Sequence, residues 1–179
     1  YIVFGPFATG SSLVGSASVK LGGDLSLDEA GGYIAGPADF NGDGLDDVLI
    51  TATRASDASG VIDRGLLFLV SGADIATWTA GSSLILDEEA AYYWRGDNSY
   101  DWLGGAVAQA GDINGDGIED FLTAATADDA SYTNSGTVLF YRGSSSFVGG
   151  ARGSMASANA TLYGVGANHY SSRNVTGVG

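Results

Sequence analysis

Short apolar segments separated by polar turns make up most of this chain. The segments are rich in Val, Ile, Leu, Phe and Tyr and are bounded by Gly, Ser, Asp and Asn, a pattern typical of β-strands. In the clearest stretch they predict four strands, near residues 32–38, 47–52, 65–71 and 83–87. No segment keeps a helical period, and residues 151–161, rich in Ala, Ser and Gly, are predicted to form a loop, with a short helical turn as the alternative. The predicted fold class is all-β.

The same order of segments occurs twice. The run from Asp39 to Asp47 returns between Asp112 and Asp120, a step of 73 positions (112 − 39). A Gly-Gly pair precedes each run, and an apolar strand follows each run. Units of about four strands with such a period are typical of the blades of a β-propeller.

Each repeated run carries the oxygen ligands that a hard cation requires. Side-chain oxygens stand at positions 1, 3, 5 and 9, and a Gly at position 6 allows a tight turn. This spacing predicts two Ca²⁺ sites; the alternative is a turn without an ion, because Asp, Asn and Gly favour turns in any case. An EF-hand is excluded, since position 12 holds Ile50 in one run and Thr123 in the other instead of an acid, and the flanks are strand-like.

The charge balance narrows the range of partners. The net charge is -14, so a phosphate backbone would be repelled and no nucleic-acid binding is expected. No apolar run approaches the roughly 20 residues of a membrane span, so no membrane insertion is expected. There is no Cys, which rules out a disulfide framework. No signal peptide is visible, so the sequence is either mature or cut from something longer.

A longer pattern surrounds each acidic run. The order Gly-Gly-x-Val-Ala-x-x-Gly-Asp-x-Asn-Gly-Asp-Gly-x-x-Asp, followed by an apolar strand, resembles the FG-GAP repeat of integrin α-subunit propellers and of many bacterial surface proteins. The second unit, Trp102–Ala125, matches it better than the first, which departs from it at Gly36-Pro37-Ala38. The resemblance implies a seven-bladed β-propeller with four antiparallel strands per blade and calcium between strands 1 and 2 of some blades.

The resemblance also implies the calcium ligands. The first site would use the side chains of Asp39, Asn41, Asp43 and Asp47 and the carbonyl of Leu45. The second would use the side chains of Asp112, Asn114, Asp116 and Asp120 and the carbonyl of Ile118. Asp46 and Glu119, at position 8, are expected to point to solvent. An ion that stabilises its loop in this way suggests a calcium-rich compartment, hence the outside of the cell.

About two and a half units of one propeller-type domain are expected. Residues 1–30 would end a preceding blade, with Tyr1–Gly5 as one of its strands, and residues 172–179 would begin a third repeat. Residues 31–103 and 104–171 would form the two repeats between them. Open strand edges at both ends would be satisfied by a longer chain or by association between copies.

The predicted function is an extracellular, calcium-stabilised adhesion or scaffold module, non-enzymatic, that presents loops to a protein or glycan partner. One alternative is a structural subunit of an extracellular fibre or ring, in which copies pair through edge strands. The other is a non-catalytic part of a secreted lyase or hydrolase. The single histidine, His169, has no evident partners for a catalytic triad.

Three smaller features are open to more than one interpretation. Asn159 and Asn174 begin Asn-x-Thr triplets, which are acceptors of N-linked glycans but also arise by chance in such a composition. Arg95-Gly96-Asp97 is a cell-attachment triplet, yet its Gly-Asp pair aligns with Gly23-Asp24, which favours a recurring turn. Trp102 occupies the position of the family's Phe and is expected to be buried.

Overall fold

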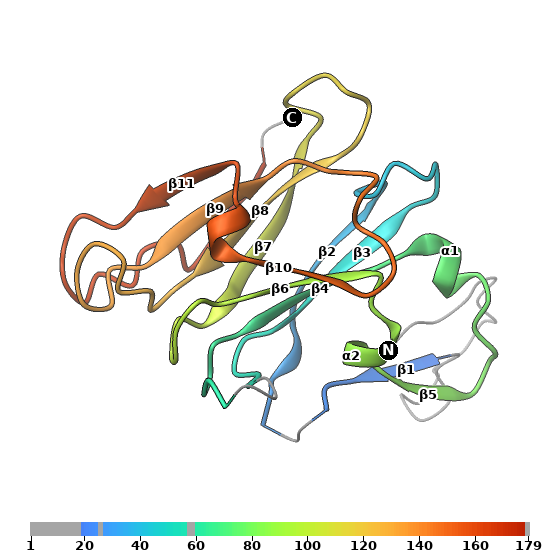
Figure 1. Cartoon of the computed structure of the whole chain (residues 1–179), viewed down its shortest axis with the longest axis horizontal. Coiled ribbons are helices and arrows are strands. Elements are labelled where there is room, and N and C mark those ends of the chain that lie inside the picture. Colours follow the sequence, from blue (N-terminus) through green and yellow to red (C-terminus); the bar gives the residue numbers. More distant parts are fainter. Residues whose placement is uncertain (1–18, 25–26, 57–59, 178–179) are drawn as a thin grey trace, which may run out of the picture.

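The computed structural model describes residues 19–24, 27–56 and 60–177, which form two larger β-sheets packed side by side and a small sheet of two strands (Figure 1). Blade 1 contains β2 (Ala30–Ala38), β3 (Asp47–Ala52), β4 (Leu66–Val70) and β6 (Tyr92–Arg95). Blade 2 contains β7 (Leu103–Gly111), β8 (Asp120–Ala125), β9 (Thr137–Tyr141) and β11 (Ala160–Tyr163). Within each blade these neighbours are antiparallel, so the all-β prediction is confirmed and the architecture is that of a partial β-propeller. The strand predicted at Tyr1–Gly5 lies outside the described residues, as do positions 178 and 179.

The first three strands of blade 1 lie where the apolar pattern predicts them. The structure places them at residues 30–38, 47–52 and 66–70. All five residues of β4, Leu-Leu-Phe-Leu-Val, are buried because both faces of the blade are covered. A continuous apolar run bounded by Gly is therefore a reliable strand signal in this chain.

The strand predicted near residues 83–87 is present in part, but its assignment as the fourth strand of the blade is wrong. Residues Ser82–Ile85 form β5, which pairs in parallel with β1 (Val19–Gly22) in a separate sheet of two strands. Two short helices, α1 (Gly72–Ile75) and α2 (Leu86–Glu89), lie between β4 and β6. The fourth strand of blade 1 is instead β6, and its aromatic side chains fill the space between the blades. Burying the aromatic side chains of β6 removes more apolar surface from water than burying residues 83–87 at this place would, so β6 takes the fourth position.

The prediction of a loop over residues 151–161 is also wrong. This segment contains β10 (Ala151–Ser154), a 3₁₀ turn, η2 (Met155–Ser157), and the start of β11. Strand β10 leaves blade 2 and pairs in parallel with β6 at the outer edge of blade 1. Gly153 of β10 lies directly against the indole ring of Trp94. A Cβ added at this glycine would come within 2.6 Å of Cδ1 of Trp94, so no larger residue fits here. Of the small residues that suggested a loop, Gly153 is thus needed for this close approach.

An aromatic cluster joins the two blades. Trp94 of blade 1 is 1% exposed, and its ring centroid lies 4.9 Å from those of Phe121 and Phe147 and 5.5 Å from that of Tyr141. Phe40 packs edge-on against Phe121 at 5.7 Å. A second core, on the other face of blade 1, lies against α2 and the β1–β5 pair.

Trp102 is half-buried, so the prediction that its side chain is buried is wrong. It has a positive φ of 54°, and its Nε1 is buried without a hydrogen-bond partner. The guanidinium of Arg54 lies 5.4 Å from the centroid of its ring, where a cation–π contact stabilises the exposed part of the indole. The buried aromatic residue of this region is instead Trp94.

Candidate metal centres and the opposite loop face

Two acidic loops connect the first and second strands of the blades. Loop 1 (residues 39–46) joins β2 to β3, and loop 2 (residues 112–119) joins β7 to β8. Because corresponding strands run in the same direction in the two blades, both loops lie at the same end of the sheets, at the upper right in Figure 1.

The first Asp of each loop accepts hydrogen bonds from three backbone N–H groups. Asp39 Oδ1 accepts from Gly42 at 2.6 Å and from Asp43 at 3.1 Å, and Asp39 Oδ2 accepts from Gly44 at 2.9 Å. The corresponding distances around Asp112 are 2.7, 3.1 and 2.8 Å. This first carboxylate therefore closes each loop into a tight turn.

The oxygens at positions 3 and 5 continue the same arrangement. Asn41 Oδ1 accepts from the N–H of Asp43 at 2.9 Å, and Asp43 Oδ1 accepts from the N–H of Leu45 at 2.8 Å. In loop 2 the equivalent bonds of Asn114 and Asp116 measure 2.9 and 3.0 Å. At positions 1, 3 and 5 the two loops therefore accept the same hydrogen bonds, although they share only part of their sequence.

The Asp at position 9 anchors each loop to the core. Asp47 is fully buried, and it accepts hydrogen bonds from Phe40 N at 3.0 Å and from Gly72 N at 2.9 Å. Burial raises the pKa of Asp47 to about 6 and the charge of Asp43 adds to this effect, while these hydrogen bonds oppose it. Asp120 is also fully buried and makes the equivalent bonds, at 3.0 and 2.9 Å.

The chemistry of the donors fits a hard cation. Each loop offers carboxylate and amide oxygens only, which are the ligands that Ca²⁺ prefers. Over residues 19–24, 27–56 and 60–177, however, no three acidic or histidine side chains come together as a metal-binding group. Arg54 forms ion pairs with Glu29 and with Asp63, and neither of these ion pairs involves a residue of loop 1 or loop 2. The side chains named as ligands are thus present and ordered by the loop, whereas calcium itself stays a prediction, as do the carbonyl ligands Leu45 and Ile118.

The two residues at position 8 differ. Asp46 is exposed, as expected, but the expectation that Glu119 points to solvent is wrong. Its Oε1 accepts a hydrogen bond from Gly111 N at 2.9 Å, and the side chain is half-buried. The backbone N–H of Glu119 donates to the carbonyl of Asp39 at 2.9 Å, so loop 1 is tied directly to the end of loop 2.

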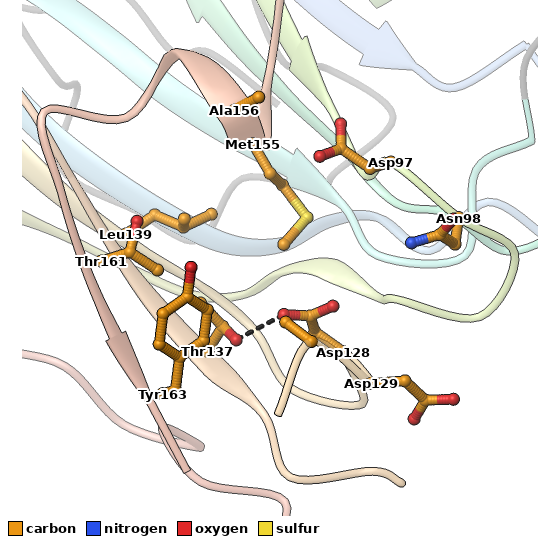
Figure 2. A pocket seen from close by; sticks show the side chains of 11 residues that line it. Asp97, Asn98, Asp128, Asp129, Thr137, Leu139, Met155, Ala156, Thr161 and Tyr163 are labelled. Atoms are coloured by element: carbon orange, nitrogen blue, oxygen red, sulfur yellow. Dashed lines mark hydrogen bonds between the residues drawn. The ribbon is translucent and has the colours of Figure 1, made fainter. Parts of the chain in front are cut away.

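A cavity of about 410 Å³ lies at the other end of the sheets (Figure 2). Three carboxylates, those of Asp97, Asp128 and Asp129, line it together with the side chains of Met155 and Tyr163. Asp128 is 3% exposed and accepts a hydrogen bond from the hydroxyl of Thr137. The opening is therefore acidic on one side and apolar on the other.

Sequence reasoning missed a buried acid beside this cavity. Asp101 is 2% exposed, and it accepts a hydrogen bond from Asn98 N at 2.7 Å. Burial raises its pKa to about 6, and the charges of Asp128 and Asp97 add to the effect. The signal was available in the repeat, because Asp28, also buried, stands 73 positions earlier (101 − 28).

The remaining sequence motifs lie outside loops 1 and 2, and one of their residues, Asp97 of the Arg-Gly-Asp triplet, also lines the cavity. Asn159 and Asn174 are exposed, and Asn159 Oδ1 accepts a hydrogen bond from Arg142 N at 2.8 Å, so glycosylation stays a prediction for both. Gly96 of the Arg-Gly-Asp triplet is buried, and an added Cβ would collide with the carbonyl of Arg64. This tight turn favours the structural interpretation of the triplet over attachment. His169 is exposed.

Comparison with protein families assigns the repeats. The family model of the FG-GAP repeat matches residues 31–62 and 104–141, which contain loop 1 and loop 2. The chain therefore contains two FG-GAP repeats, as the sequence predicts. A search of curated proteins finds no match.

The FG-GAP repeat indicates in broad terms where a protein is located and whether it is an enzyme. FG-GAP repeats are typical of extracellular or surface proteins and are generally non-enzymatic. In the described part of the chain, no helix has the length and apolar character needed to cross a membrane.

Proposed function

We propose that this chain is an extracellular, calcium-stabilised scaffold or adhesion module of the FG-GAP type, without catalytic activity, which presents loops to a protein or glycan partner. The observation that carries the proposal is the matching set of side-chain oxygens in loops 1 and 2. The recurrence of the hydrogen bonds at positions 1, 3 and 5 in two different sequence contexts indicates a shared requirement, and coordination of a cation at the two sites would meet it.

Electrostatics supports calcium. Each loop holds three carboxylates at positions 1, 5 and 9, and mutual repulsion among them disfavours the closed loop. A divalent cation removes this repulsion, and at 100 times its dissociation constant it would add about 2.7 kcal/mol of stability per site. Because the carbonyl of Asp39 binds Glu119 N, an ion in loop 1 would also stiffen the joint between the blades.

The opposite ends of the blades are suited to a partner. The connections there expose Ile62, Tyr100 and Tyr132, which are 51%, 53% and 54% exposed. Exposed aromatic and apolar side chains beside the acid-lined cavity are typical of surfaces that bind proteins or sugars. Calcium at one end and recognition at the other would let the ion set the spacing of the recognition loops without touching the partner.

Calorimetric titration tests the calcium sites. We expect two bound Ca²⁺ per chain and a higher melting temperature in calcium than in EDTA. The matched variants are Asp43→Asn and Asp46→Asn, which remove the same charge from the same loop. Asp43→Asn should weaken one site, because Asp43 Oδ1 lies inside the loop, while Asp46→Asn should leave both sites intact. Absence of heat at millimolar calcium, or equal effects of the two variants, would contradict the proposal.

A partner screen tests the recognition face. The purified chain would be applied to arrays of glycans and of extracellular proteins, and any binder would be titrated against two variants. Tyr100→Ala should weaken binding several-fold, while Val148→Ala should not, because Val148 is exposed in the connection from β9 to β10, whose Ser144 N bonds the Phe40 carbonyl of loop 1. If Val148→Ala weakens binding and Tyr100→Ala does not, the recognition face has been placed wrongly.

A fibre or ring subunit is the second candidate. The specific observation in its favour is β11, which has β9 as its partner on one side and no paired strand on the other among the described residues. Sedimentation separates the two candidates, because a fibre subunit would associate as concentration rises, whereas a scaffold module of this kind should remain a monomer.

A further inference from the structure

Loops 1 and 2 each contain an Asn-Gly pair. Asn41-Gly42 and Asn114-Gly115 are both followed by Asp-Gly, and the sequence has no other Asn-Gly pair. Glycine has no side chain that hinders its backbone nitrogen, so an Asn followed by Gly loses its side-chain amide more readily than an Asn followed by a larger residue. Because the local sequences match, any difference between the two pairs must come from the fold around them.

Within the loops the two pairs are held alike. Gly42 N donates to Asp39 Oδ1 at 2.6 Å, and Gly115 N donates to Asp112 Oδ1 at 2.7 Å. In each loop the Asn side-chain nitrogen lies 3.4 Å from Oδ1 of the Asp at position 9. Loss of the amide requires the Gly nitrogen to leave its hydrogen bond and reach the Asn side chain, so the loop must first open. The rate therefore depends on what else holds each loop closed.

Blade 2 covers the Asn-Gly pair of loop 1. Asn41 is 4% exposed, and Phe40 before it is 0% exposed and packs edge-on against Phe121. Ile118 lies over the glycine, since a Cβ added at Gly42 would come within 2.8 Å of Ile118 Cδ1. Two backbone donors of blade 2 bind the carbonyls of the two residues before Asn41, at 2.9 and 3.1 Å. Opening loop 1 therefore requires part of the contact between the blades to break.

The Asn-Gly pair of loop 2 is uncovered in the described part of the chain. Asn114 is exposed, and Ile113 before it is 63% exposed. A Cβ added at Gly115 would meet nothing within 4 Å among the described residues. Loop 2 can thus open by breaking only its own hydrogen bonds, and this local opening costs less free energy than the opening of loop 1.

We propose that Asn114 is a site of spontaneous deamidation in the folded protein, whereas blade 2 protects Asn41 from the same reaction. The Gly115 nitrogen attacks Cγ of Asn114, and the new C–N bond closes a succinimide ring. The Cγ–Nδ2 bond breaks, and the amide leaves as ammonia with the proton of the Gly115 nitrogen. Water then opens the ring at either carbonyl and leaves aspartate or isoaspartate at this position. Burial and contacts between the blades carry this proposal, which does not depend on calcium.

The modification changes both the charge and the backbone of loop 2. Either product adds a negative charge to a loop that already holds three carboxylates, and the added repulsion disfavours the closed loop. Isoaspartate also carries the main chain through the former side chain, so the oxygen that accepts from Asp116 N leaves its place. Loop 2 therefore loses its closed form with time, while loop 1 keeps it.

Peptide mapping of the whole folded chain tests the proposal. The protein is incubated at mildly alkaline pH in EDTA, so that the result does not depend on the proposed calcium sites. Trypsin places the two pairs in separate peptides, residues 21–54 and 96–142, and mass spectrometry follows the change from amide to acid in each. We expect Asn114 to react at least about ten-fold faster than Asn41, because a difference of about 1.4 kcal/mol in opening free energy is already a factor of ten. Asn114→Gln should abolish the mass gain of peptide 96–142, and in urea the two pairs should react at equal rates.

Matched variants test the protection by blade 2. Ile118→Ala uncovers Gly42 and should speed the reaction at Asn41 several-fold, while Ile113→Ala, at an exposed Ile of the same loop, should leave Asn41 unchanged. Circular dichroism checks that each variant is folded. Equal rates at the two pairs in the folded protein, or no reaction at Asn114 while the chain in urea reacts fully, would overturn the proposal. So would equal effects of the two Ile variants on Asn41.

Discussion

Replacement of Trp94 by Ala should destabilise the protein far more than the same truncation at its counterpart in blade 2, Leu162. Trp94 is 1% exposed and touches three aromatic rings of blade 2, whereas Leu162 is 71% exposed. Both residues occupy the same place in a fourth strand, because Trp94 pairs with Leu67 of β4 and Leu162 pairs with Val138 of β9. The comparison therefore isolates burial between the blades.

The size of the effect follows from the area removed. A buried Trp covers about 150–250 Å², which at about 25 cal/mol per Å² corresponds to roughly 4–6 kcal/mol. Truncations of buried Phe or Trp to Ala typically cost about 3–5 kcal/mol, so we expect about 4 kcal/mol for Trp94→Ala. For Leu162→Ala we expect a change within about 0.5 kcal/mol, as at other exposed positions. Trp94→Phe keeps a ring in the cluster and should fall between them.

Urea unfolding followed by far-ultraviolet circular dichroism measures these differences. Tryptophan fluorescence is unsuitable, because Trp94 is itself one of the three tryptophans. Both variants should be measured at the same fixed calcium concentration. A loss below about 1 kcal/mol for Trp94→Ala, or an equal loss for Leu162→Ala, would refute the view that the aromatic cluster holds the blades together.

Two further predictions concern a buried acid and a buried turn. Burial raises the pKa of Asp101 to about 6, so the stability that this protonated carboxyl contributes is complete below about pH 4 and is lost as the pH rises through 6. The loss is at most about 3 kcal/mol. Asp101→Asn keeps an acceptor for Asn98 N and should remove this pH-dependent loss. Melting curves of both proteins from pH 4 to 7.5 check this, and parallel pH profiles would contradict it. Gly65 and Gly60 have φ of 79° and 80°, so Ala costs roughly 1–2 kcal/mol at either through the backbone. Only at Gly65 would the new Cβ also collide with the backbone of Leu103, so Gly65→Ala should be clearly the more destabilising in urea titration, and equal losses would argue against that close approach.

The repeat itself was readable from the sequence because its signals are local. A turn closed by Asp39 or Asp112 needs oxygens and glycines at fixed spacing, and an apolar strand such as β4 shows its burial in its composition. The same spacing predicted which side chains belong to the candidate metal centres. In the structure, hydrogen bonds from backbone N–H groups hold these side chains in place within each loop. The turn of each loop was therefore predictable from the sequence, while the ligand roles of its side chains stay a prediction.

The errors lie where a distant partner decides the conformation. Strand β10 forms because β6 offers an edge and Trp94 needs a glycine over its ring, and neither condition is visible in Ala151–Ser154. Likewise β5 has its partner in β1, some 60 positions earlier (82 − 19 = 63), rather than in its own blade. Trp102 is half-buried because its neighbour on the exposed side is Arg54 rather than another strand. Such tertiary choices override local propensity.

Strand β10 also separates the unit of sequence from the unit of folding. It is encoded between β9 and β11 of the second repeat, yet it completes the sheet of the first. Blade 2 cannot separate from blade 1 without removing β10 from the sheet of blade 1, so the two blades should resist a pulling force as one mechanical unit. A fragment that ends at residue 103 would therefore expose the aromatic side chains of β6 and tend to aggregate, although it contains one complete sequence repeat.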